Sequence, residues 1–70
     1  MDLRNQTIMV GELLDNPRSR AVFQRRFGKL IQHPMVEGAR YLTLRQLVEM
    51  AGVIVPQKVI RETLQELQKL

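Results

Sequence analysis

The residue types that most often perform catalysis are few in this 70-residue chain, and they lie far apart. His33 is the only histidine, and the chain has no cysteine. Cys–His catalysis and thiolate metal sites are therefore excluded. The position of His33 directly before Pro34 indicates a helix end, where the ring can donate to terminal carbonyls. We predict neither a catalytic role nor metal binding for it.

The carboxylates and glycines also lack a catalytic pattern. The seven carboxylates are dispersed, and Glu62 and Glu66 share one face of an expected helix, which is typical of a solvated surface. The four glycines are isolated, so the chain has no glycine-rich loop to bind phosphate. A helical bundle of this size is not expected to enclose a substrate pocket. We therefore predict a non-enzymatic protein without cofactor, metal or small-molecule substrate.

The composition favours one folded domain. Hydrophobic residues make up 44% of the chain and charged residues 26%, which is ordinary for globular proteins and argues against disorder. No apolar run approaches the ~20 residues of a transmembrane helix, and the N-terminus lacks the apolar stretch of a signal peptide. The absence of cysteine fits a reducing compartment. We expect a cytoplasmic location without membrane attachment.

Helix signals organise the first half of the chain. Residues 8–14 have the apolar spacing of a short helix. Asn16 is a favourable N-cap for the next helix, and Pro17 is a favourable first helical residue. That helix is predicted to continue through Phe27, with Gly28 as the residue that follows its C-terminus.

The second half carries clearer signals. After two short helical segments expected at residues 29–33 and 34–39, Thr43 and Gln46 have the spacing of a capping box. This box predicts a helix over residues 44–51, which Gly52 ends.

The last helix is expected to start with Pro56 as its first residue and to continue close to Leu70. At ~100° per residue its apolar side chains share one face. The polar side chains occupy the remainder, which makes this the most amphipathic segment of the chain.

These elements predict an all-α fold, a compact bundle of four to five short helices. Residues 1–8 are assigned to an N-terminal tail and residues 9–70 to the single helical domain. The predicted core consists of Leu13, Leu14, Val22, Phe23, Phe27, Leu30, Leu44, Leu47, Val48, Ile60, Leu64 and Leu67.

The run Val53-Ile54-Val55 is the candidate protein-contact surface. Three consecutive β-branched apolar residues between two helices cannot all point inward, and exposed apolar patches often mark contact sites. The core of a 70-residue chain is also marginal, and self-association would add buried area. We therefore predict a module for protein–protein interaction or structural support, with a second copy of the chain as one candidate partner.

Residues 43–64 provide an alternative hypothesis, because they resemble a helix-turn-helix. Ala51-Gly52-Val53 lies where that motif turns, and Val59 and Leu64 match apolar positions of its recognition helix. Against this, Val48 stands where the motif prefers a small residue. The tip at residues 55–58 also offers few groups that read bases.

The positive charge is concentrated in the middle of the chain. Residues 16–42 carry six basic and one acidic side chain, a net charge of +5. Such a segment can meet nucleic acid or an acidic protein surface. Because the arginines spread around their helix, they are more typical of a solvated surface than of a nucleic-acid interface. Under the alternative hypothesis the nucleic-acid contacts are Arg18, Arg25, Arg26, Lys29, Gln57, Lys58 and Arg61.

The order of the helix signals resembles a known kind of module. Val10-Gly11-Glu12-Leu13-Leu14-Asp15-Asn16-Pro17 is followed by Ala21-Val22, Phe27, His33-Pro34-Met35, Tyr41-Leu42-Thr43-Leu44, Leu47 and a helix led by Pro56. Over residues 9–70 this order is similar to small helical modules near the C-termini of some bacterial β-glucosidase-like glycoside hydrolases, which are sometimes found alone. The resemblance implies a bacterial accessory module for packing, oligomerisation or a regulatory contact, with no catalytic residues.

Overall fold

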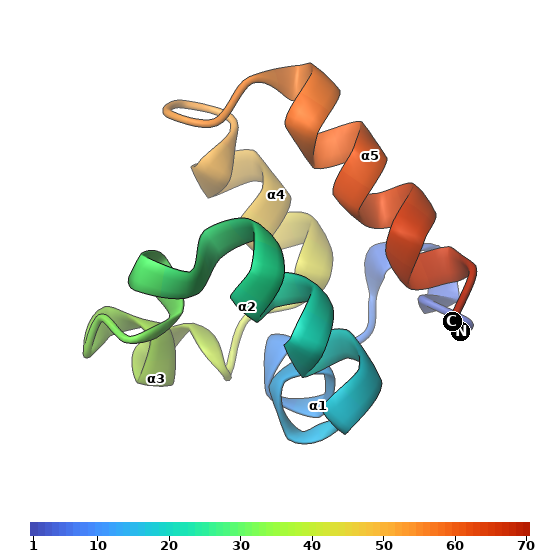
Figure 1. Cartoon of the computed structure of the whole chain (residues 1–70), viewed down its shortest axis with the longest axis horizontal. Coiled ribbons are helices and arrows are strands. Elements are labelled where there is room, and N and C mark those ends of the chain that lie inside the picture. The colour runs from blue at the N-terminus through green and yellow to red at the C-terminus, as the bar shows by residue number, and fades with distance from the viewer.

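A computed structural model describes the backbone of residues 1–70 and the side chains of all residues except Met35. Over this backbone an all-α fold is seen, as predicted, and no strand occurs (Figure 1). An isolated antiparallel bridge joins Met9 to Thr43. The elements are the 3-10 helix η1 (Arg4–Gln6) and the α-helices α1 (Val10–Asp15), α2 (Pro17–Ile31), α3 (Met35–Ala39), α4 (Leu44–Ala51) and α5 (Gln57–Gln68).

Two helix starts follow from local chemistry. The side chain of Asn16 accepts a hydrogen bond from the Arg18 backbone N–H at 2.9 Å, and Pro17 is the first residue of α2. Thr43 and Gln46 form both hydrogen bonds of the capping box, at 3.2 and 2.9 Å. Each cap satisfies backbone donors that a helix start leaves without a partner. Both predicted starts are confirmed.

Helix α2 differs from the prediction at its C-terminal end. The helix bends at Phe27, whose φ and ψ are −135° and 34°, and then continues to Ile31. The prediction that Gly28 lies beyond the helix end is wrong, because the chain resumes helical geometry and Gly28 does not adopt a positive φ. A weak helix former beside the bend lowers the cost of the kink. Figure 1 shows that the two halves of α2 run in different directions.

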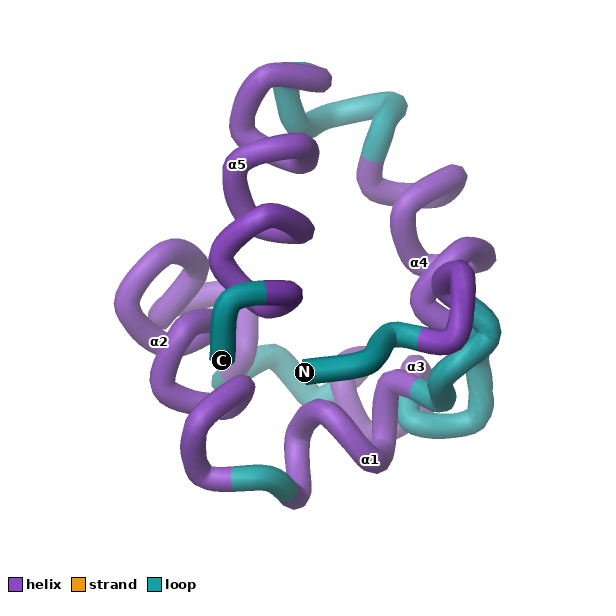
Figure 2. The backbone as a smooth tube through the Cα atoms, turned by 90° about the vertical axis from the view of Figure 1, so that its right-hand side faces the viewer, coloured by secondary structure: helices purple, strands orange, loops and turns teal.

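Helix α5 begins at Gln57, one residue later than predicted, and Pro56 is its N-cap. At the other end the N-terminal ammonium of Met1 donates a 2.9 Å hydrogen bond to the Gln68 carbonyl and a second one to Leu70. A positive charge is favourable at a helix C-terminus, where carbonyls lack partners. The two chain ends therefore lie side by side (Figure 2).

Residues 1–8, predicted to be a tail, are part of the packed domain. Leu3 and Ile8 are both buried and belong to the main hydrophobic cluster. Between them, Arg4, Asn5 and Gln6 have φ values of 53°, 55° and 69°, a left-handed turn. This turn reverses the chain, so that the leucine and the isoleucine reach the same core.

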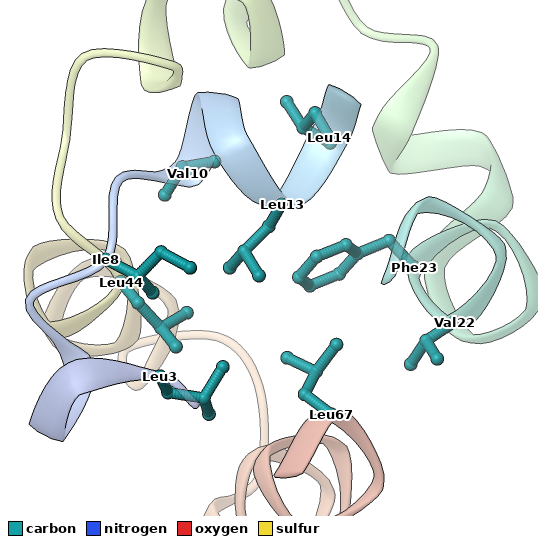
Figure 3. Close-up of a cluster of buried hydrophobic side chains, with 9 residues drawn as sticks. All are labelled: Leu3, Ile8, Val10, Leu13, Leu14, Val22, Phe23, Leu44 and Leu67. Atoms are coloured by element: carbon teal, nitrogen blue, oxygen red, sulfur yellow. The ribbon is translucent and has the colours of Figure 1, made fainter. Parts of the chain in front are cut away.

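The core lies where α1, α2, α4, α5 and the N-terminal segment meet (Figure 3). Of the predicted core residues, Phe27, Leu47, Val48 and Leu64 are half-buried and pack against it, and Leu30 is 54% exposed. The prediction for Leu30 is wrong, because beyond the bend at Phe27 it is Ile31 that packs against the core. The buried predicted residues are Leu13, Leu14, Val22, Phe23, Leu44, Ile60 and Leu67.

Candidate functional site

An apolar pocket of about 200 Å³ opens between the helices. All five α-helices and the loop between α4 and α5 contribute side chains to its wall. Figure 2 shows α4 and α5 as two arms joined at one end by this loop. Among the described residues, every side chain of the wall except Thr63 is aliphatic or aromatic.

The pocket runs from the core to the surface. Its wall includes Leu44 and Leu67, which are 2% and 0% exposed, and these residues mark its floor. The same wall includes Leu30 and Ile54, which are 54% and 78% exposed. A residue that lines the pocket and still faces solvent marks the mouth.

The one polar side chain of the wall is already satisfied. The Thr63 hydroxyl donates a 2.7 Å hydrogen bond to the Val59 carbonyl within α5. No buried side-chain polar atom of the described residues lacks a hydrogen-bond partner. The pocket therefore presents almost only carbon, and an ordered water would find few of the two to four polar partners it needs.

The pocket is open to solvent, because its wall includes the exposed residues Leu30 and Ile54. Part of its apolar wall is therefore in contact with water. An apolar group that fills the pocket removes this wall from water, which is favourable by about 25 cal/mol for each Å² of apolar surface.

Among the described residues, the pocket wall carries no acid–base group. No described side chain of the wall is titratable, so the wall offers neither a general acid nor a general base. The sequence predicted no enclosed substrate pocket, and the pocket seen here is an open one. The pocket lies between the bent helix α2 and the helices α4 and α5, which are joined at only one end. The periodicity of a sequence gives no information on the space between separate helices.

The three residues of the candidate contact surface, Val53, Ile54 and Val55, differ in their exposure to solvent. Val53 is 84% exposed and Ile54 is nearly as exposed, whereas Val55 is half-buried and lines the pocket. Met50, at the end of α4, is also exposed. We call Leu30, Met50, Val53 and Ile54 the apolar rim. The sequence prediction missed Leu30 and Met50, and the pair Leu30-Ile31 directly after the bend was the available signal.

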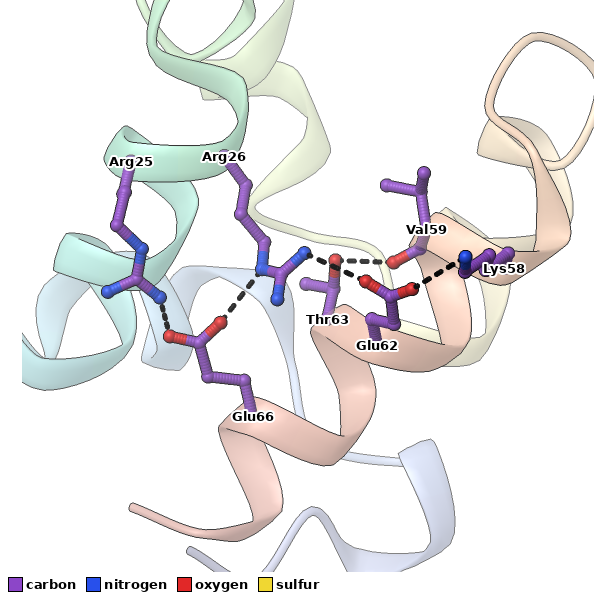
Figure 4. Close-up of polar contacts among 7 residues, drawn as sticks. All are labelled: Arg25, Arg26, Lys58, Val59, Glu62, Thr63 and Glu66. Atoms are coloured by element: carbon purple, nitrogen blue, oxygen red, sulfur yellow. Dashed lines mark hydrogen bonds and ion pairs between the residues drawn. The ribbon is translucent and has the colours of Figure 1, made fainter.

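The residues that would contact nucleic acid under the alternative hypothesis fall into two groups. Arg25 and Arg26 form ion pairs with Glu66, with an Arg26–Glu66 distance of 2.8 Å, and Lys58 approaches Glu62 to 4.0 Å (Figure 4). These pairs join α2 to α5 or lie along α5. The second group is exposed and consists of the uncharged Gln57 and of three cations that form no ion pair with a described residue, Arg18, Lys29 and Arg61.

Arg40 forms a second connection between helices, away from the pocket. Its guanidinium donates hydrogen bonds of 2.8 and 2.7 Å to the two carboxylate oxygens of Asp15. These hydrogen bonds, and then the charge of Asp15, raise the pKa of Arg40. The pair links the end of α3 to the end of α1. His33 lies just beyond the end of α2 and is exposed.

Comparison with protein-family models, curated proteins and solved structures finds no match to this chain. The resemblance to hydrolase-associated modules thus stays a hypothesis. Among the described residues, no helix is both long and apolar enough to cross a bilayer. Within the same residues, His, Asp and Glu side chains do not gather in threes or more where they could hold a metal ion.

Proposed function

We propose that this chain is a non-enzymatic helical module for protein–protein interaction or structural support, and that it binds through the apolar rim. A bacterial, cytoplasmic accessory role, as the resemblance to hydrolase-associated modules implies, belongs to the same proposal. The observation that carries it is the exposure of Val53 and Ile54, at 84% and 78%, beside the mouth of the apolar pocket. Apolar side chains that gather at one place on a surface are typical of contact sites.

A second copy of the chain is the partner we propose to test first. The small core is the reason, since self-association adds buried apolar area that 70 residues alone do not supply. Protein anchors at interfaces are typically large side chains that enter pockets. The apolar rim includes residues of the pocket mouth. Exposed side chains of one copy can therefore enter the pocket of a second copy.

Two observations favour protein contact over nucleic-acid binding. Arg25, Arg26 and Lys58 have their charges opposed by carboxylates of α5, which reduces their attraction for phosphate. The exposed part of the loop between α4 and α5 includes Val53 and Ile54, and neither side chain can hydrogen-bond to a base edge.

The proposal is tested by sedimentation velocity over a wide range of protein concentration. We expect reversible self-association for the native chain and its loss in the double variant Val53→Asp/Ile54→Asp, because charges on the rim must then be desolvated at the contact. Tyr41→Ser is the matched control, since Tyr41 is 81% exposed and does not line the pocket. A strict monomer from which pull-down recovers no partner contradicts the proposed function.

A further inference from the structure

We propose that the apolar pocket binds the unbranched alkyl chain of a medium-chain carboxylate, with the carboxylate held outside the mouth. This inference does not rest on the proposed function, because ligand binding inside the pocket and self-association through the rim are measured separately. The proposal names the chemical class of ligand for the apolar pocket, which the sequence did not predict.

The lining decides the chemistry of the ligand. The wall is carbon except for Thr63, whose hydroxyl is engaged with Val59. A ligand with a polar group inside the pocket would leave that group without a hydrogen-bond partner, which is strongly unfavourable. The part of the ligand that enters is therefore a hydrocarbon.

The volume and depth decide its size and shape. A cavity of ~150 Å³ holds benzene, which has six carbon atoms, so about 200 Å³ holds about eight. The pocket extends from Leu67, which is fully buried, to Ile54, which faces solvent. A linear chain fits this course from floor to mouth, and it places its polar end in water.

The charge near the mouth favours an anionic end. Lys29 directly precedes the mouth residue Leu30 in α2, is exposed, and forms no ion pair with a described residue. The ion pairs of Glu62 and Glu66 with α2 and with Lys58 already engage the carboxylates of α5. Because the whole chain also carries a net charge of +4, a carboxylate outside the mouth is favoured over an alkylammonium.

Isothermal titration calorimetry with the linear carboxylates from butanoate to dodecanoate tests the proposal. We expect the dissociation constant to fall roughly fourfold with each added methylene. This gain stops at a length of about nine carbons, eight in the pocket and one in the carboxylate. Absence of saturable nonanoate binding overturns the proposal. So does affinity that keeps rising through dodecanoate, since adsorption to exposed apolar surface has no length limit.

Two alanine substitutions separate the pocket from the rest of the surface. Ala51 lines the pocket, whereas Ala21 is exposed on α2 and does not. Ala51→Leu adds three carbons to the wall and is expected to weaken nonanoate binding roughly fiftyfold, at roughly fourfold for each displaced methylene. Ala21→Leu makes the same change outside and is expected to leave binding unchanged. Equal binding by the two variants overturns the site assignment.

Three further variants test the pocket if Ala51→Leu does not fold, the role of Lys29, and the separation of the pocket from the rim. If circular dichroism shows that Ala51→Leu is unfolded, Ala39→Leu fills the pocket from the α3 wall with the same expected loss. Lys29→Gln is expected to weaken nonanoate binding and to leave nonanol binding unchanged, and an equal effect on both overturns the role of Lys29. Val53→Asp is expected to weaken self-association but to retain binding of the uncharged nonanol, so a failure of self-association can be told apart from a failure of ligand binding.

Discussion

Leu30 and Ile54 line the same apolar pocket although more than half of each side chain is exposed to solvent. Leu30 belongs to the part of α2 that follows the bend at Phe27, and Ile54 belongs to the loop between α4 and α5. Both residues mark the mouth of the pocket and belong to the apolar rim. The candidate site therefore depends on how the end of α2 is placed relative to the loop between α4 and α5, two segments that are far apart in the sequence.

The first prediction compares Leu67 with Leu30, two leucines that the sequence assigns to the core. Leu67→Ala removes a fully buried side chain and is expected to lower the free energy of unfolding by about 2–5 kcal/mol. Leu30→Ala removes an exposed one and is expected to cost less than about 1 kcal/mol. Urea denaturation followed by circular dichroism measures both. Similar losses for the two variants would show that Leu30 is packed inside.

The second prediction concerns two helical glycines. A Cβ at Gly28 meets nothing within 4 Å, so Gly28→Ala is expected to stabilise the protein by about 0.5–1 kcal/mol through helix propensity. A Cβ at Gly11 would lie 3.1 Å from the Arg40 carbonyl oxygen, which accepts a 3.0 Å hydrogen bond from the Gly11 N–H.

Gly11→Ala must therefore push this backbone contact apart, and we expect a loss of about 1 kcal/mol despite the better propensity of alanine. Thermal unfolding gives the sign for each variant. A gain in melting temperature for Gly11→Ala as large as that for Gly28→Ala contradicts the close contact between α1 and Arg40.

The third prediction tests the left-handed turn at Arg4–Gln6. Gln6 has a φ of 69°, a conformation that costs an L-residue with a side chain roughly 1–2 kcal/mol and glycine little. Gln6→Gly is expected to raise the free energy of unfolding by about 0.5–1 kcal/mol. Gln24→Gly, at an exposed position within α2, is expected to lower it by about 1 kcal/mol. Chemical denaturation of both variants checks the opposite signs, and a loss in both refutes the turn geometry.

The fourth prediction concerns the ion pairs between α2 and α5 (Figure 4). Glu66 pairs with Arg25 and Arg26 and is largely shielded from solvent. Glu66→Gln is expected to destabilise the protein by about 1 kcal/mol, and the loss should shrink as salt is added. Glu49→Gln is the control, because Glu49 is exposed and forms no ion pair with a described residue. Denaturation midpoints at low and high salt measure both variants, and an equal effect contradicts the bridge.

Local signals predicted the helical fold and most helix boundaries. Asn16 with Pro17 and the Thr43–Gln46 capping box act within one turn of helix, so the chain alone specifies them. The apolar face of α5 was likewise readable, because periodicity needs only the sequence. The exposure of Val53 and Ile54 was predicted too, since three β-branched residues in a row cannot all be buried.

The sequence by itself thus determined the all-α class, the helix caps and the apolar character of residues 53–55. The tertiary structure decided that Leu3 and Ile8 join the core, that Leu30 faces solvent, and that an apolar pocket opens between Leu67 and Ile54. The physical reason is the range of the interactions. Caps and periodicity depend on neighbours three or four residues away, whereas a bend, a packed terminus and an unfilled space depend on how separate helices meet.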